Sequence, residues 1–331
     1  MRTDSRLAGV LVCLWLGFGA ASCSASHEAS PGPVDAARGA NPADATTDED
    51  AFADAGTTAD AEFAVDAAVG GGTDASAGDG GRDYSTDRGT FFGASRCADA
   101  GVQLCEDFES GMINPSIWTV SGTRPVVDTM QAARGTHALH ITQHGNGLSY
   151  IKETSTFPEA NDTYFGRVFV YFKSLPATLP DGGMNYAHWT MLAGSGTGAP
   201  GEIRVSGQLQ NGKNLFGVGT DTGTYDAGSG DWTTSDNDPK GSPSPVPLGQ
   251  WLCIEWMHKG DTNETRFYWN AVEHPSLYTS ATQHGGNMNP YDLPQFTNVW
   301  MGWQEYQTST EPFEMWIDEI AIDKERIGCV L

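Results

Sequence analysis

The chain has 331 residues, of which 42 are acidic and 18 are Lys or Arg, so its formal net charge is −24. Such an acidic excess makes nucleic acid and anionic membranes poor partners, because both would repel it. The sequence contains no P-loop, no dinucleotide-binding glycine fingerprint and no internal repeat.

Residues 1–22 have the pattern of an export signal. Arg2 and Arg6 precede an apolar run, Leu7 to Phe18, which is too short to span a bilayer. Small residues then lead to Cys23 in the order Ala-Ala-Ser-Cys, which resembles a bacterial lipobox. The sequence therefore predicts lipidation at Cys23 and anchoring at the bacterial cell surface or outer membrane, with free secretion as the alternative. Membrane contact would be made only through the lipid.

Residues 23–96 are predicted to form a disordered tether. From residue 24 onward the segment is dominated by Ala, Gly, Asp and Thr, has no Trp, and holds 14 acidic residues against 4 basic ones. Such a composition cannot bury enough apolar surface to order the chain.

Residues 97–331 are predicted to form one all-β domain, expected to be monomeric. Short alternating runs are separated by Gly, Pro, Asn and Asp, and no window shows a helical period. This pattern is typical of a β-sandwich or jelly roll. The clearest runs are Thr163–Lys173, His188–Ala193, Ile203–Gln210, Gln250–His258, Thr265–Val272, Thr297–Gln307 and Phe313–Asp323.

Four cysteines remain in the predicted domain, and an exported protein with an even number of cysteines is expected to form disulfides. They allow three pairings. We favour Cys97 with Cys105, which closes a local loop, and Cys253 with Cys329, which ties a central strand to the last residues.

The run Gly201–Gln210 predicts a strand with an unusual polar face. At a two-residue period, Glu202, Arg204, Ser206, Gln208 and Gln210 share one side. Other runs add further polar side chains, and the resulting candidate surface contains Arg167, His188, Arg204, Gln208 and Tyr306.

These residue types suit β-elimination on a uronic-acid polymer. Arg204 and Gln208 would bind the sugar carboxylate, His188 or Tyr306 would remove the adjacent proton, and Tyr306 would protonate the leaving oxygen. Each residue also has a structural interpretation: His188 or Tyr306 as a hydrogen-bonded scaffold residue, and Arg204 as the ion-pair partner of Glu202.

Substrate contacts are expected around that surface. Trp189, Trp232 or Trp303 could stack on sugar rings, although Trp189 and Trp303 could equally belong to the core. Gln304 and Arg167 are further candidates for binding substrate, and so is Tyr225 in the loop Thr220–Pro247, which is expected to border the site.

A calcium site is expected at the two ends of the domain. Glu109 and Asp318 are carboxylates on the first and last predicted strands, and the sequence ARGTHALHI supplies a glycine turn whose carbonyl groups could join them. The alternative is a pair of exposed acids. A metal here would be structural, far from the polar surface.

The motifs CEDFESG, ARGTHALHI, HWTML, EIRVSGQ, QWLCIEW, VWMGWQEY and MWIDEIAIDKERIGC occur in this order. Together they resemble the secreted fungal cellulose-induced proteins related to glucuronan lyases, over about residues 105–329. The resemblance implies a concanavalin-A-like β-jelly roll and a Ca²⁺ site at Glu109, Asp318 and the carbonyls of Arg134 and His137. It also implies lyase-like positions for His188, Arg204, Gln208, Asp231 and Tyr306, with Asp231 orienting or tuning the base. Glu202 departs from the pattern, because some relatives carry histidine there.

The predicted activity is therefore that of an extracellular polysaccharide lyase on a glucuronan-like substrate. The alternatives are a carbohydrate-binding module without catalysis and a structural surface protein. Hydrolysis is the lesser interpretation, because the paired-carboxylate ExDxxE motif of related hydrolases is absent.

Overall fold

The computed structural model describes residues 81–144, 147–176, 188–198, 201–210, 212–221, 232–234, 245–284, 291–306 and 312–331. The predicted signal, Cys23 and most of the predicted tether lie outside these residues, as do Tyr225 and Asp231. Among the described residues no helix is long and apolar enough to cross a membrane.

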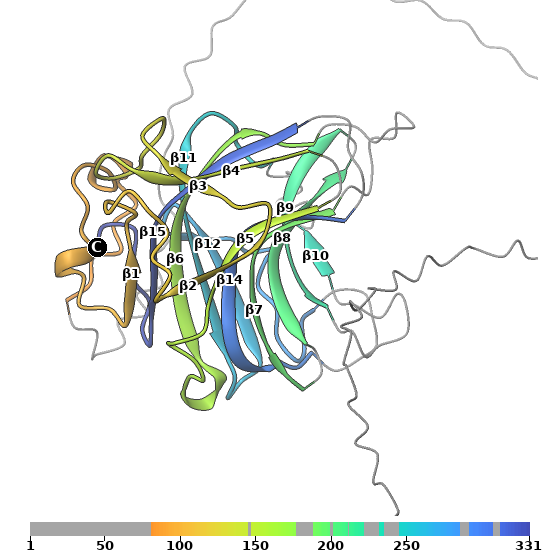
Figure 1. Ribbon diagram of the computed structural model, residues 1–331. Coiled ribbons are helices and arrows are strands. Elements are labelled where there is room, and N and C mark those ends of the chain that lie inside the picture. The colour runs from red at the N-terminus through yellow and green to blue at the C-terminus, as the bar shows by residue number, and fades with distance from the viewer. Residues whose placement is uncertain are drawn as a thin grey trace, which may run out of the picture. The chain divides into compact units, whose positions relative to one another are not determined.

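The described chain forms an all-β jelly roll of two antiparallel sheets (Figure 1), which confirms the predicted fold class. The eight-stranded sheet has the order β13-β12-β11-β6-β15-β4-β3, with β1 paired to β15, and the seven-stranded sheet has the order β10-β9-β8-β7-β14-β5-β2. The first contains β1 (Leu104–Glu106), β3 (Val126–Asp128), β4 (Ala138–His144), β6 (Tyr164–Ser174), β11 (Trp251–Lys259), β12 (Glu264–Trp269), β13 (Val272–Glu273) and β15 (Pro312–Asp323). The second contains β2 (Trp118–Gly122), β5 (Gly147–Glu153), β7 (His188–Thr197), β8 (Glu202–Gln210), β9 (Lys213–Asp221), β10 (Trp232–Thr234) and β14 (Gln295–Glu305).

Three short 3-10 turns complete the described elements: η1 (Arg88–Thr90), η2 (Cys97–Asp99) and η3 (Ala160–Asp162). Within the described residues, the predicted strand runs lie on strands apart from a residue or two at their ends, with one exception in the run Thr265–Val272. That run breaks at Asn270 and Ala271, whose φ angles are 49° and 67°. Two consecutive positive φ angles are characteristic of a tight hairpin turn, so the run divides into β12 and β13.

The core between the sheets is built on stacked aromatic rings. Trp189 and Trp303 from the seven-stranded sheet stack at 5.2 Å, and Trp303 stacks at 3.7 Å on Phe313 from the opposite sheet. Gly207 makes room for this stack, because a Cβ atom there would lie 2.1 Å from the indole of Trp189. The glycine in the polar-faced strand β8 is therefore a packing requirement of the inner face.

The segment from residue 81 to residue 96, predicted to belong to the tether, packs on the domain instead (Figure 1, orange). Phe91 is fully buried, and Arg96 donates hydrogen bonds to the carbonyls of Thr90 and Val330. The predicted boundary at residue 97 is thus too late. A few side chains are sufficient to anchor this segment to the domain. The average composition of a long polar segment does not reveal them.

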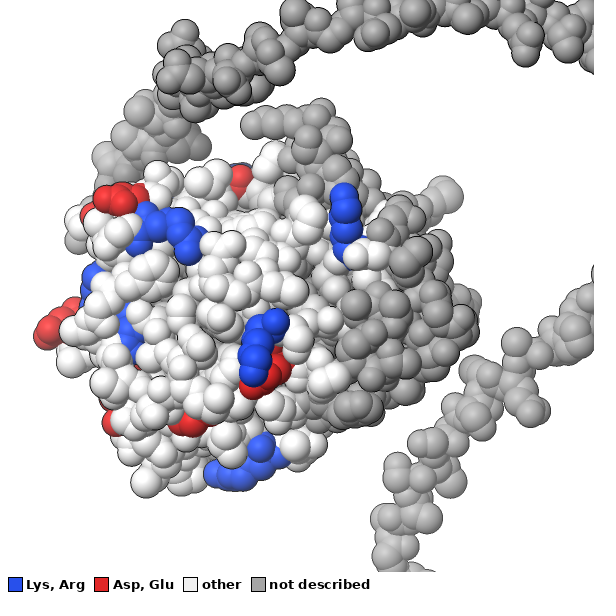
Figure 2. All heavy atoms as spheres, turned by 90° about the horizontal axis from the view of Figure 1, so that it is seen from above, with Lys and Arg blue, Asp and Glu red and all other residues white. Residues whose placement is uncertain are grey.

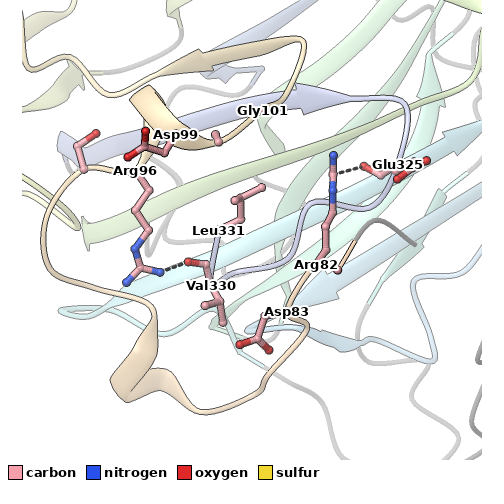
Figure 3. Close-up of a pocket in the computed structure, with 11 residues that line it drawn as sticks. Arg82, Asp83, Arg96, Asp99, Gly101, Glu325, Val330 and Leu331 are labelled. Carbon is pink, nitrogen blue, oxygen red and sulfur yellow. Dashed lines mark hydrogen bonds between the residues drawn. The ribbon is translucent and has the colours of Figure 1, made fainter. Parts of the chain in front are cut away.

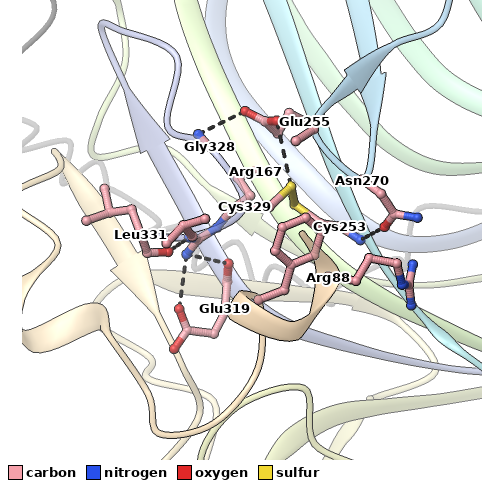
Figure 4. Close-up of a disulfide and its surroundings, with 12 residues drawn as sticks. Arg88, Arg167, Cys253, Glu255, Asn270, Glu319, Gly328, Cys329 and Leu331 are labelled. Carbon is pink, nitrogen blue, oxygen red and sulfur yellow. Dashed lines mark hydrogen bonds and ion pairs between the residues drawn. A yellow bond between two sulfur atoms is a disulfide. The ribbon is translucent and has the colours of Figure 1, made fainter. Parts of the chain in front are cut away.

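Both predicted disulfides are present, Cys97–Cys105 and Cys253–Cys329. The second joins β11 to the last residues of the chain, next to the buried carboxylate of Glu255 (Figure 4). It therefore holds the C-terminal segment against the outer face of the eight-stranded sheet.

Candidate functional site

The outer face of the seven-stranded sheet carries four of the five members of the predicted polar surface, and the strand register brings these four together. His188 is paired with Gln208, and Thr190 with Ser206, across β7 and β8. Because paired residues of antiparallel strands point to the same side of the sheet, these four side chains lie on one face. Tyr306 follows β14 directly, and its N–H donates to the carbonyl of His188 at 3.1 Å.

The side chain of Tyr306 contacts Thr190 and Arg204. Its hydroxyl lies 3.1 Å from the hydroxyl of Thr190, which in turn lies 3.0 Å from that of Ser206. The guanidinium of Arg204 lies 4.8 Å from the centre of the Tyr306 ring. A phenol, a guanidinium and a pair of hydroxyl groups are therefore clustered, and the His188 backbone is directly attached to the cluster.

Arg204 is also paired within its own strand. Its Nε donates to Glu202 at 2.5 Å, and the second carboxylate oxygen of Glu202 accepts from the hydroxyl of Ser195 at 3.1 Å. The side chains of Arg204 and Glu202 are each about one-fifth exposed. The ion pair lies at the surface, so a ligand carboxylate would compete with Glu202 for the guanidinium.

Amide and aromatic side chains extend the surface on both sides. Gln208 donates to Gln210 at 2.8 Å, and Gln304 is paired in register with Thr190. On β5, Tyr150 stacks on Trp300 with their ring centres 4.5 Å apart. Thr190 and Tyr150 are not predictable as residues of this surface from the sequence, because only the sheet order β8-β7-β14-β5 places their strands in the same sheet as β8.

Three predicted substrate contacts are wrong. Arg167 lies on β6 of the other sheet and is fully buried, with its guanidinium 3.0 Å from Glu319. Trp189 and Trp303 are fully buried in the core stack, so neither can meet a sugar ring. Strand alternation assigns residues to faces, but it cannot say which sheet a strand joins or which face is covered.

The predicted metal ligands meet at the loop of residues 133–137. Glu109 accepts hydrogen bonds from the N–H groups of Thr136 and His137 at 2.7 and 2.8 Å. Asp318 accepts from the N–H groups of Ala133 and Arg134 through Oδ2, at 2.8 and 3.0 Å. Burial raises the pKa of Asp318 to about 7, although these N–H groups act in the opposite direction. Glu109 and Asp318 thus both accept hydrogen bonds from backbone N–H groups of the same glycine turn.

The donor set at this loop fits a hard cation. Carboxylate and carbonyl oxygens are the ligands that Ca²⁺ takes in proteins. Among the hydrogen bonds between described residues, Asp318 Oδ1 accepts only the N–H of Glu319, so it keeps a lone pair for a further ligand. The carboxylates of Glu109 and Asp318 therefore offer oxygen atoms of the type that Ca²⁺ takes, beside the same loop.

A separate pocket of about 660 Å³ lies between the segment 81–101 and the C-terminal residues (Figure 3). Its arginines are engaged in holding the chain together: Arg82 donates to the carbonyls of Glu325 and Arg326, and Arg96 to that of Val330. Acidic side chains, Asp83 and Asp99, line the same pocket. We interpret this pocket as part of the interface where the N-terminal segment packs on the domain.

Comparisons with known proteins support the fold. No family model matches the chain, and no curated protein matches its sequence. Among solved structures, a cellulose-induced protein is similar over 69% of this chain and 100% of its own, with 21% identity and a TM-score of 0.50. An alginate lyase (10% identity, 56% of this chain and 74% of its own, TM-score 0.40) also matches. So does domain 4 of an extracellular arabinanase from Geobacillus stearothermophilus in complex with arabinotriose (15% identity, 69% and 97%, TM-score 0.38). At 21% identity, the likeness to the cellulose-induced protein supports the jelly-roll fold alone.

Proposed function

We propose that the protein is an extracellular lyase that cleaves a uronic-acid-containing, glucuronan-like polysaccharide by β-elimination. The observation that carries this proposal is the placement of Tyr306 between Arg204 and Thr190, with its N–H bonded to the carbonyl of His188. A cation for the sugar carboxylate and two proton-transferring side chains are thereby joined on one surface.

In the proposed reaction, Arg204 and Gln208 bind the carboxylate and stabilise the negative charge that develops when the neighbouring C5 proton is removed. His188 or Tyr306 takes that proton, and the C5–H electron pair forms the C4–C5 double bond. The C4–O bond breaks, and the departing oxygen takes a proton from Tyr306. The product is a chain with an unsaturated uronate at its new non-reducing end.

Calcium is proposed as a structural ion, held by Glu109, Asp318 and the carbonyls of Arg134 and His137. When bound it would join the turn that follows β1 to β15 through the glycine turn, and it takes no part in the reaction. The export signal, the lipid at Cys23 and the role of Asp231 remain predictions on residues outside the described structure.

The test is the ultraviolet absorbance of the unsaturated product. Full-length protein would be incubated with glucuronan, alginate, pectate and neutral glucans, with Arg204→Ala as the site variant. Arg266→Ala is the matched control, because Arg266 is paired with Glu273 on the other sheet. We expect product from a uronate polymer with the wild type and the control, and none with Arg204→Ala.

A carbohydrate-binding module without catalysis is the competing function, and a second pair of variants separates the two. Tyr306→Phe and His188→Ala should lower turnover by about 10²- to 10⁴-fold while binding persists. Absence of unsaturated product from every uronate polymer, with polymer binding intact, would contradict the lyase proposal and favour the module.

A further inference from the structure

A chain of hydroxyl groups runs beneath the candidate site. Thr190 of β7 and Ser206 of β8 are register partners on the outer face of the seven-stranded sheet, yet each is only 1% exposed. Their hydroxyl oxygens lie 3.0 Å apart, and Thr190 Oγ1 lies 3.1 Å from the hydroxyl of Tyr306. These three groups are hereafter the hydroxyl chain. Tyr306 is its half-buried member, so a ligand on the surface would meet the chain at the phenol.

The fold directs Thr190 to this position through irregularities in two ladders. The register between β7 and β8 shifts between Thr190 and Leu192, and the register between β7 and β14 shifts directly before Gln304, the partner of Thr190. Met191 and Leu192 are both buried in the core, so two consecutive side chains of β7 turn inward while Thr190 stays on the outer face. β-Bulges redirect side chains in this way and are frequent beside functional sites.

The proposed reaction requires one direction of hydrogen bonding along the hydroxyl chain. A threonine or serine hydroxyl has a single proton to donate. If Tyr306 is to protonate the departing oxygen, its own proton must point at the ligand, so the phenol oxygen must accept a hydrogen bond from Thr190. Thr190 must then accept its second contact from Ser206. After the transfer the phenol oxygen is anionic and can only accept, so the same direction serves both protonation states of Tyr306.

Donors in direct contact with the phenol matter because the protein as a whole disfavours an additional negative charge. Its formal net charge is −24. In Figure 2 the charged side chains of the described residues are scattered among uncharged ones, with no broad positive field on that face. A hydrogen bond to an anionic oxygen is stronger than one to a neutral oxygen. The hydroxyl chain therefore supplies stabilisation at the atom where the charge forms.

We propose that Thr190 is a positioning residue for Tyr306: it donates a hydrogen bond to the phenol oxygen, and Ser206 orients it by donating to Thr190 in turn. The inference rests on the proposed lyase function and deepens it. Thr190 and Ser206 keep their own protons throughout, and the proton that reaches the departing oxygen comes from Tyr306. Thr190 is buried, so it acts through Tyr306 and does not touch the substrate.

The competing interpretation is that Thr190 only fills space beneath the tyrosine ring, and two substitutions separate the two roles. Thr190→Val keeps the shape of the side chain and removes the hydroxyl, whereas Thr190→Ser keeps the hydroxyl and removes a methyl group. If packing is the role, Thr190→Ser should be the more damaging change. If donation to Tyr306 is the role, Thr190→Val should be the more damaging change.

The experiment measures kcat and KM of the full-length protein on a uronate polymer, from the ultraviolet absorbance of the unsaturated product. Thr279→Val is the matched control, because Thr279 is a similarly buried threonine that donates to the hydroxyl of Tyr291 at 2.7 Å, beside β12 of the other sheet. A second readout needs no substrate: the ¹³C resonance of Tyr306 Cζ in protein labelled at that atom of tyrosine, assigned by its loss in Tyr306→Phe.

We expect Thr190→Val to lower kcat by about 10- to 100-fold, with KM changed by less than about twofold, and to move the Tyr306 resonance. Thr190→Ser should restore kcat to within about threefold of the wild type, and Thr279→Val should change neither kcat nor the Tyr306 resonance. Urea unfolding checks each variant. If Thr190→Val does not fold, Ser206→Ala decides, with a smaller loss of kcat expected.

The inference is overturned if the wild type cleaves a uronate polymer and folded Thr190→Val has the same kcat, or the same Tyr306 resonance, as the wild type. It is also overturned if Thr190→Ser is as slow as Thr190→Val, because the role would then be packing. A wild type that cleaves no uronate polymer contradicts the proposed function itself. The Tyr306 resonance would then show whether the hydroxyl chain exists as a structural contact alone, which would overturn the positioning role in a reaction.

Discussion

The guanidinium of Arg204 lies over the ring of Tyr306, 4.8 Å from its centre, while its Nε is bound to Glu202. A cation against the face of a tyrosine is attracted by the ring, and the contact orients both groups. The pairing has an immediate consequence for ligand choice, because the same guanidinium already has a carboxylate partner inside the protein.

Replacing Glu202 with Gln should strengthen binding of a uronate polymer. The substitution removes the internal competitor for Arg204, and surface ion pairs of this kind are worth up to ~1 kcal/mol, so the dissociation constant should fall by roughly two- to fivefold. Titration calorimetry with uronate oligosaccharides measures the change. Glu273→Gln, which breaks the ion pair with Arg266 on the other sheet, should leave binding unchanged. Weaker binding by Glu202→Gln would mean that Glu202 supports the ligand rather than competing with it.

Replacing Arg167 with Met should destabilise the fold without affecting the proposed reaction. Burial lowers the pKa of Arg167, and its guanidinium shares Glu319 with Arg134, both at 3.0 Å. Breaking a buried pair costs about 3 kcal/mol of unfolding free energy, measurable in urea. Turnover per folded molecule should match the wild type. If Arg167→Met lost turnover while keeping the stability of the wild type, Arg167 would have a role in the reaction.

His258 should impose a loss of stability at acidic pH. It is fully buried, its Nδ1 lies 3.0 Å from the Thr265 hydroxyl, and burial lowers its pKa to about 3. Below about pH 6.5 this histidine binds a proton in the unfolded chain but not in the folded chain. The free energy of unfolding therefore falls as the pH drops from about 6.5 towards 3, by up to ~1.4 kcal/mol per pH unit. Urea unfolding at two pH values within this window measures the slope.

His258→Gln removes the titrating group and is expected to flatten that slope, even if its stability at neutral pH is lower. If the unfolding free energy of His258→Gln differs between the two pH values by as much as that of the wild type, the acid sensitivity belongs to the carboxylates. Lowering the pH would then act through groups other than His258.

Calcium should raise the melting temperature through Glu109. A ligand at about 100 times its dissociation constant adds ~2.7 kcal/mol to the stability of the state that binds it. Scanning calorimetry with added Ca²⁺ or EDTA should show a shift for the wild type and for Glu273→Gln, and little shift for Glu109→Gln. Equal melting temperatures in Ca²⁺ and EDTA would show that the glycine turn is held by hydrogen bonds alone.

The sequence by itself determined the all-β class and the position of most of the long strands, and the cysteine pairing that it favoured is confirmed. These features depend on local chemistry: alternation at a two-residue period, turn residues between runs, and the few pairings that four cysteines allow. It also identified Glu202, Arg204, Ser206 and Gln208 as one face, because a single strand is enough to define them.

Only the tertiary structure decided which strands are neighbours and which faces are covered. Arg167 and Arg204 have the same alternating surroundings in the sequence, yet β6 and β8 belong to different sheets. Arg167 is buried against Glu319 and the carbonyl of Leu331, while Arg204 stays at the surface. Trp189 and Trp303 became core residues because the two sheets meet there. Sheet order and layer contact join residues distant in the chain, so no local pattern specifies them.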